Sequence, residues 1–228
     1  MEKNKIGKYL KYAFGEIVLV VIGILIALSI NNWNDKRETD NRIKDIYVII
    51  QNDLLTDIET IDKLLVSSEF RDSIFKRVLN KEMTNDDYLK CNRCISILGG
   101  YPDIKLKTGG LKLLEENSTF LNSIQDRLSV KVIGFYHNFN TEIEVAIEEV
   151  DQDYSDNRYH FKNNKPWFED YQSQLPNEDF IKYALESQDY RNRVRSFYGV
   201  YYELYLGLLK DYRASALILV EEINKGIK

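Results

Sequence analysis

The hydrophobic residues of this chain form one uninterrupted run near the N-terminus and helical stripes after it. Residues 17–30 read IVLVVIGILIALSI without a charge, and the apolar segment reaches back to residue 12 with Glu16 as its single charged side chain. A helix needs about 20 apolar residues to cross about 30 Å of hydrocarbon. The pattern therefore predicts a transmembrane helix over residues 12–31.

After residue 42, apolar residues recur at spacings of three and four, as they do along the buried face of an amphipathic helix. The stripes comprise Ile43, Tyr47, Ile50, Leu54, Ile58, Ile61 and Leu65, then Leu121, Ile124, Leu128, Val132, Phe135, Phe139, Ile143, Ala146 and Val150, and last Val194, Phe197, Tyr201, Leu204, Leu208, Leu219 and Ile223. No segment shows sustained strand alternation. We expect an all-α protein, with one N-terminal transmembrane helix followed by an elongated antiparallel helical bundle.

Breaking and capping residues indicate where these helices end. No Gly or Pro occurs over residues 24–98, which favours helix. Thr84 and Ser118 are suitable N-caps, the first for a short helix and the second for the long central one. We expect residues 151–176 to be loop-like, because they are polar, with one short helix near residues 167–171. Further helices are expected over residues 111–116, after Pro176-Asn177, and over residues 190–223.

Two features of the apolar run go beyond what an anchor needs. A carboxyl at Glu16 is costly in lipid and points to function, although it could instead lie near the headgroups and pair with a nearby Lys. Gly23 and Ala27 form a small-xxx-small pattern that lets two helices approach closely. These residues share a stripe with Val20, Ile30 and Asn34.

Residues 12–34, YAFGEIVLVVIGILIALSINNWN, resemble the signature of an uncharacterised family of bacterial single-pass membrane proteins with a domain of unknown function. The resemblance is tight over residues 12–35 and looser over residues 106–114 and 128–136. It implies a membrane location, a helical domain after the anchor, and membership of the family's motif for Glu16, Asn31, Asn32 and Trp33. Fixed polar residues in a membrane helix suggest a partner in or at the membrane.

The expected organisation is a basic N-terminal segment (1–11), the transmembrane helix (12–31), a polar stalk or hinge (32–42) and the helical bundle domain (43–228). Four lysines precede the apolar run, whereas two basic residues follow it within ten residues and four within a slightly longer window. This modest bias predicts a bacterial inner (cytoplasmic) membrane protein with a cytoplasmic N-terminus and an extracytoplasmic bundle. A cleaved signal peptide is the alternative, but the apolar stretch exceeds the usual length.

Composition excludes several classes of function. The chain has 31 Lys+Arg against 36 Asp+Glu and a net charge of −5, which argues against nucleic acid as a partner. Only two histidines are present, no Glu-x-x-His pair accompanies Glu144 and Glu148, and no G-K-[ST] follows Thr108-Gly109-Gly110. We therefore expect no enzyme activity, no catalytic residue, no cofactor and no metal site.

Cys91 and Cys94 are the only cysteines. They form a possible disulfide outside the cytoplasm, and packed thiols, a redox pair and half a metal site are the alternatives. Most tyrosines of the last helix should lie in the core. Arg191, Arg193 and Arg195 are expected on a solvated face.

The function expected is that of a membrane-anchored, non-enzymatic interaction or scaffold protein, self-associating through its transmembrane helix. Its partners would be the lipid bilayer and either further copies of itself or another membrane protein. The alternative is an extracytoplasmic ligand-sensing accessory module. Because eleven residues precede the helix, such a sensor would signal through a separate membrane partner.

Overall fold

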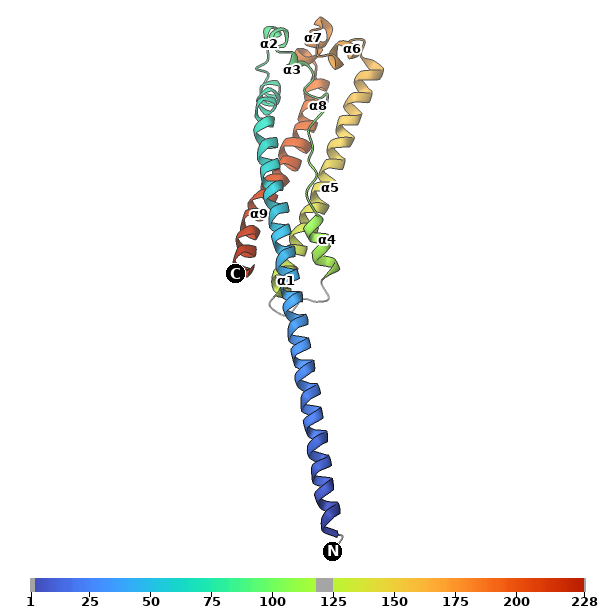
Figure 1. The fold of residues 1–228 in the computed structure, drawn as a ribbon. Helices are drawn as coiled ribbons and strands as arrows, with labels where there is room; N and C mark the ends of the chain where they lie inside the picture. Colours follow the sequence, from blue (N-terminus) through green and yellow to red (C-terminus); the bar gives the residue numbers. More distant parts are fainter. Residues whose placement is uncertain (1–2, 118–124, 228) are drawn as a thin grey trace.

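The computed structural model describes residues 3–117 and 125–227. Its first element, α1 (Lys3–Leu79), is one helix of 77 residues. The apolar run, residues 32–42 and the first helix of the bundle therefore form a single rod that projects from one end of the molecule (Figure 1). One helix of this kind, long and apolar enough to cross a membrane, lies in the described part of the chain.

The remaining elements build the bundle and its cap. They are α2 (Asn85–Lys90), α3 (Asn92–Ile95), α4 (Gly109–Glu116), α5 (Gln125–Asn164), α6 (Phe168–Gln172), α7 (Glu178–Glu186), α8 (Gln188–Tyr198), the π-helix η2 (Gly199–Tyr205) and α9 (Leu206–Ile227). No strand occurs in residues 3–117 and 125–227, and the all-α prediction is confirmed. The expected cap Ser118 lies outside the described residues.

The long helices pack through most residues of the stripes that the sequence predicts, but Leu204 is exposed, and Leu121 and Ile124 lie outside the described residues. Ile43, Ile50 and Leu54 of α1 are buried, as are Val132 and Val150 of α5. Most apolar residues of α8, η2 and α9, which together form the last rod, are also buried. Chain colour in Figure 1 shows α1 and α5 running away from the N-terminus and α8–η2–α9 running back toward it. The last rod is therefore antiparallel to both other helices.

An extended segment, residues 99–108, makes this arrangement possible, and we call it the strap. It carries the chain from the far end of the bundle back to α4 (Figure 1). The Tyr201 hydroxyl donates to the Pro102 carbonyl at 2.8 Å, and the Ile104 N–H donates to the Tyr205 hydroxyl at 3.1 Å. The π-helix thus holds the strap through two tyrosines.

The loop expected over residues 151–164 is wrong, because α5 continues to Asn164. Asn157 and Phe161 are buried, and they continue the spacing of Val150 and Tyr154. Polar residues on the outer face hide this stripe in the sequence. The expected short helix exists as α6.

The end of the bundle opposite the N-terminus consists of α2, α3, α6 and α7, which we call the cap (Figure 1). Thr84 begins α2 with a capping box that includes Asp87, and the Asn177 side chain accepts from two N–H groups at the start of α7. Each bond satisfies donors that a helix N-terminus leaves free. Phe161, Trp167 and Phe180 pack edge-to-face or tilted beneath these helices.

Candidate functional site

The residues of the predicted membrane motif lie on the exposed part of α1. No residue of its most apolar window is buried. Glu16, Gly23, Ala27, Asn31 and Asn32 are exposed, and Trp33 is 62% exposed. Space for a Cβ at Gly23 is open, with no atom within 4 Å. The stripe therefore faces the surroundings of the helix.

Polar residues after the apolar run make side-chain contacts with one another along the helix. The Asn31 amide donates to Asp35 at 3.0 Å, and the Asn34 amide donates to Glu38 at 3.1 Å. The Arg37 guanidinium lies 5.0 Å from the centre of the Trp33 ring. Pairs at i, i+4 stabilise an isolated helix by about 0.2–0.5 kcal/mol each. Residues 32–42 thus continue the helix without a break.

Inside the bundle, two carboxylates on α1 accept hydrogen bonds from the strap and from the start of α4. Asp57 accepts from the Lys107 N–H at 3.0 and 3.1 Å and from the Tyr212 hydroxyl at 2.8 Å. Asp53, one turn earlier, accepts from the Gly110 N–H at 2.8 Å. Because α1, the strap, α4 and α9 meet here, we call the pair the acid clasp.

Asp57 is 2% exposed, and the groups that donate to it are neutral. Burial raises the pKa of Asp57 to about 6, and the bonds from Tyr212 and Lys107 limit the rise. Tyr136 lies nearby with a buried hydroxyl that has no hydrogen-bond partner. Burial first, and then Asp53 and Asp57, raise the pKa of that phenol. The clasp therefore holds a buried acid with a raised pKa at the point where α1, the strap and α9 meet.

A groove opens beside the clasp between the strap, α5 and η2. Its volume is about 370 Å³. Its apolar wall is Ile104, Leu106, Ile143, Ile147 and Tyr205, and its polar rim is Asp103, Lys105, Thr108, Asn140 and Glu144. Small-molecule sites commonly combine an apolar wall with a few polar groups.

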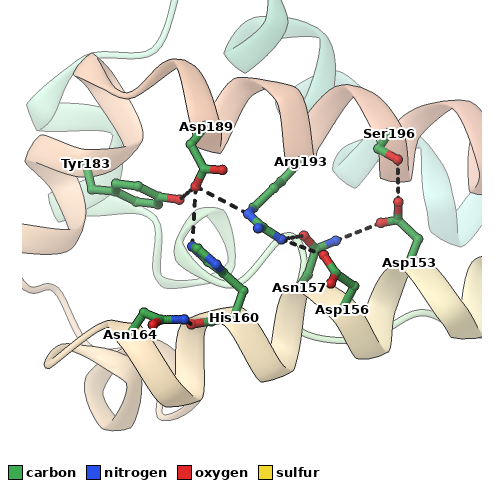
Figure 2. A network of polar contacts seen from close by, with 9 residues as sticks. All are labelled: Asp153, Asp156, Asn157, His160, Asn164, Tyr183, Asp189, Arg193 and Ser196. Carbon is green, nitrogen blue, oxygen red and sulfur yellow. Dashed lines mark hydrogen bonds and ion pairs between the residues drawn. The ribbon is translucent and has the colours of Figure 1, made fainter.

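A polar network joins α5 to α8 (Figure 2). Arg193 is its centre: Nη1 donates to Asp156 at 2.8 Å and to Asn157 at 3.1 Å, and Nε donates to Asp189 at 3.3 Å. The Tyr183 hydroxyl also donates to Asp189. The side chain of Arg193 is only 17% exposed. The expectation of a solvated arginine face is therefore wrong for Arg193, because Asp156 and Asn157 of α5 and Asp189 of its own helix accept its hydrogen bonds.

His160 lies at the edge of this network. Its Nε2 is 3.4 Å from Asp189 Oδ2, yet the geometry is not that of a hydrogen bond. Burial lowers the pKa of His160, and the charge of Arg193 lowers it further. Both effects favour the neutral imidazole. The serine of this network, Ser196, donates to Asp153 rather than to His160 (Figure 2).

The two cysteines form a disulfide between the end of α2 and α3, with Cα atoms 5.3 Å apart. In residues 3–117 and 125–227, no group of three His, Cys, Asp or Glu side chains could hold a metal ion. Arg93, between the cysteines in sequence, lies 4.4 Å from the centre of the Phe70 ring. The disulfide joins α2 to α3 within the cap, and the Arg93–Phe70 contact joins the cap to α1.

Sequence reasoning missed the acid clasp and the Arg193 network. Asp57 falls in phase with Leu54 and Ile61, so an acid on the apolar stripe was the available signal. For Arg193, the available signal was Asp189 four residues earlier, a spacing that indicates an ion pair along one helix. Its contacts with α5 depend on the tertiary fold.

Comparison with known proteins places part of this chain in context. Residues 16–99 match the model of a family of unknown function, DUF6090. The match begins at Glu16 and takes in the exposed part of α1, its bundle part, α2 and α3. No curated protein and no solved structure matches the chain.

Proposed function

We propose that this protein is a non-enzymatic interaction or scaffold protein of the bacterial inner membrane, anchored by α1 and self-associating through it. The observation that carries the proposal is the exposed apolar part of α1, which emerges from a bundle with its own buried core. Burying such a surface in lipid is favourable, whereas exposing it to water is costly.

The stripe of Glu16, Gly23 and Ala27 supports self-association. Small residues let two membrane helices approach closely, and a polar side chain then finds a partner across the interface. Placing the stripe in a dimer would remove Glu16 from lipid, where an ionisable residue is expensive.

The disulfide supports an extracytoplasmic bundle. Disulfides persist in oxidising compartments and are rare in the cytosol. With the basic residues before the helix, Cys91–Cys94 favours a cytoplasmic N-terminus.

Crosslinking in native membranes, followed by gentle solubilisation and mass spectrometry, tests the proposal. We expect the chain to resist extraction by alkaline carbonate and to crosslink to itself. Gly23→Leu should weaken the crosslinked oligomer, whereas Gly15→Leu, which lies about 80° away around the helix, should not. A soluble chain would overturn the membrane anchor, and equal crosslinking of both variants would overturn this interface.

The groove beside the clasp favours a second function, that of an extracytoplasmic sensing module that signals through a separate membrane partner. Its volume of about 370 Å³ lies in the range of small-molecule sites. Co-purification of a stoichiometric second membrane protein would favour this function. Recovery of the chain with only copies of itself would favour the scaffold.

A further inference from the structure

The groove between the strap and α5 continues beyond its apolar wall into a second hollow. This hollow has a volume of about 340 Å³, and it is lined by Gly100, Tyr101 and Asp103 of the strap and by Asp151 and Tyr154 of α5. Asp103 lines both the hollow and the groove described above, so the two lie end to end. We call the second hollow the aromatic end.

The groove and its aromatic end follow one line along α5. The groove meets this helix from Asn140 to Ile147, and the aromatic end meets it at Asp151 and Tyr154. At a rise of 1.5 Å per residue, Asn140 and Tyr154 stand about 21 Å apart along the helix axis. An occupant that fills both parts is therefore elongated.

Three carboxylates border this line without a cation paired to them. Asp103 and Glu144 are exposed, and neither carboxylate makes a hydrogen bond or an ion pair within the described part of the chain. Asp151 accepts from the Tyr101 hydroxyl, a neutral donor. Among the described residues that line the two parts, Lys105 is the one basic side chain. The lining is therefore negative in sum, which favours a positively charged occupant.

The negative charge and two aromatic rings meet at the aromatic end. The rings of Tyr101 and Tyr154 pack edge-to-face with their centres 5.7 Å apart. Burial raises the pKa of Tyr101, and the hydrogen bond to Asp151, the charge of Asp151 and the charge of Asp103 raise it further. Both carboxylates thus act at one hydroxyl. The face of an aromatic ring also attracts a cation, so rings and acids favour the same kind of group.

The rest of the groove suits a hydrocarbon chain. Its wall consists of Ile104, Leu106, Ile143 and Ile147, together with Tyr205. Ile104, Leu106 and Ile147 are half-buried, so they present apolar surface for an occupant to cover. Each Å² of apolar surface removed from water contributes about 25 cal/mol. A metal ion, or a polyamine charged along its whole length, would leave this wall in water, whereas a chain with one terminal cation matches both parts.

We propose that the groove binds an organic cation, namely an ammonium group on an apolar chain. The ammonium group lies at the aromatic end, beside the Asp103 carboxylate and the rings of Tyr101 and Tyr154. The chain follows the apolar wall toward Asn140, and Glu144 adds negative charge at the rim. This inference rests on the sensing function proposed for the groove and names the class of its ligand.

The test is isothermal titration calorimetry of the full chain in detergent, with n-hexylammonium, n-hexanol and n-hexanoate as probes. The three probes share one apolar chain and differ in the charge of the head group. We expect hexylammonium to bind saturably, and more tightly than hexanol or hexanoate. Asp103→Asn should weaken hexylammonium binding about fivefold, the equivalent of a surface ion pair of about 1 kcal/mol. It should fold, because Asp103 is exposed.

Asp211→Asn is the matched control, since it removes the same charge from an exposed position of α9 that lines neither part of the groove. We expect it to bind hexylammonium as tightly as the unaltered chain does. Equal affinities of the two variants, or no saturable binding of hexylammonium, would overturn the proposal. Tighter binding of hexanol or hexanoate would overturn the cation but leave a ligand groove for the sensing function, which the search for a second membrane protein tests separately.

Discussion

Gly110 lies directly against Ile50, so that a Cβ at Gly110 would stand 2.6 Å from Ile50 Cγ1 and 2.9 Å from its backbone N and Cα. This contact brings the start of α4 onto α1, next to the bond from the Gly110 N–H to Asp53. It also explains why the second glycine of Thr108-Gly109-Gly110 has a structural role unrelated to phosphate binding.

Gly110→Ala should destabilise the bundle by about 1–3 kcal/mol, the usual cost of overpacking, because backbone atoms of α1 have to move. Gly109→Ala is the control, since its Cβ would meet only the Asp53 carboxylate at 3.5 Å. Urea unfolding of both variants in the same detergent measures the difference. Equal stability of the two variants would show that α4 shifts without cost.

Asp57 should make stability depend on pH. Its pKa of about 6 in the fold exceeds the unfolded value of about 3.9. The folded state therefore binds the proton of Asp57 more tightly than the unfolded state does. The contribution of Asp57 to the free energy of unfolding is greatest below pH 4 and falls by about 3 kcal/mol as pH rises through 6. Asp57→Asn should remove this decrease in the free energy of unfolding between pH 4 and 6, and it should raise stability at pH 7. Asp45→Asn, exposed on the same helix, should leave the slope unchanged; an unchanged slope in Asp57→Asn would refute the assignment.

Arg193→Met should raise the pKa of His160, because the charge of Arg193 is the second cause, after burial, that keeps it low. The chain has two histidines, so a titration followed by NMR of labelled histidine resolves both. His137 is exposed and serves as the internal reference. The same variant should lose about 2 kcal/mol or more, since it leaves Asp156, Asn157 and Asp189 without their shared donor. An unmoved His160 titration would mean that Arg193 does not act on it.

Reduction of the Cys91–Cys94 disulfide should lower stability by about 2 kcal/mol, the chain-entropy value for so short a loop. Unfolding with and without reductant measures this, and the double variant Cys91→Ser/Cys94→Ser should be insensitive to reductant. Thiols trapped with acid in intact cells report on the compartment. Complete alkylation of both cysteines would contradict an oxidising location for the bundle.

Much of the fold follows from local patterns. The uncharged run of residues 17–30, the stripe around Ile50, the cap Thr84 and the helix that begins after Pro176-Asn177 are read from the sequence. Helix periodicity and capping act over a few residues, so local patterns suffice for them. The π-helix could not be predicted in this way. Tyr201 and Tyr205 of that helix bond to the strap about one hundred residues earlier in the chain.

The candidate sites were harder to predict for the same reason. Asp57 looks like one more acid in a charged helix until α9 places Tyr212 over it. Asp103 and Asp151 are far apart in the chain, and the fold alone brings them to the aromatic end of the groove. Local spacing indicates which face of a helix is buried, but it does not identify the partner on the other side.

The unbroken helix from the anchor into the bundle has a mechanical consequence. Each added residue turns an α-helix by about 100° and lengthens it by about 1.5 Å. The number of residues between the stripe of Glu16 and Gly23 and the acid clasp therefore sets the angle between the two around the helix axis. In the proposed membrane arrangement, a rotation of the bundle would be transmitted along α1 to the apolar segment, because the helix has no break between them. Two chains paired along the membrane stripe would present their bundles at one fixed angle to each other.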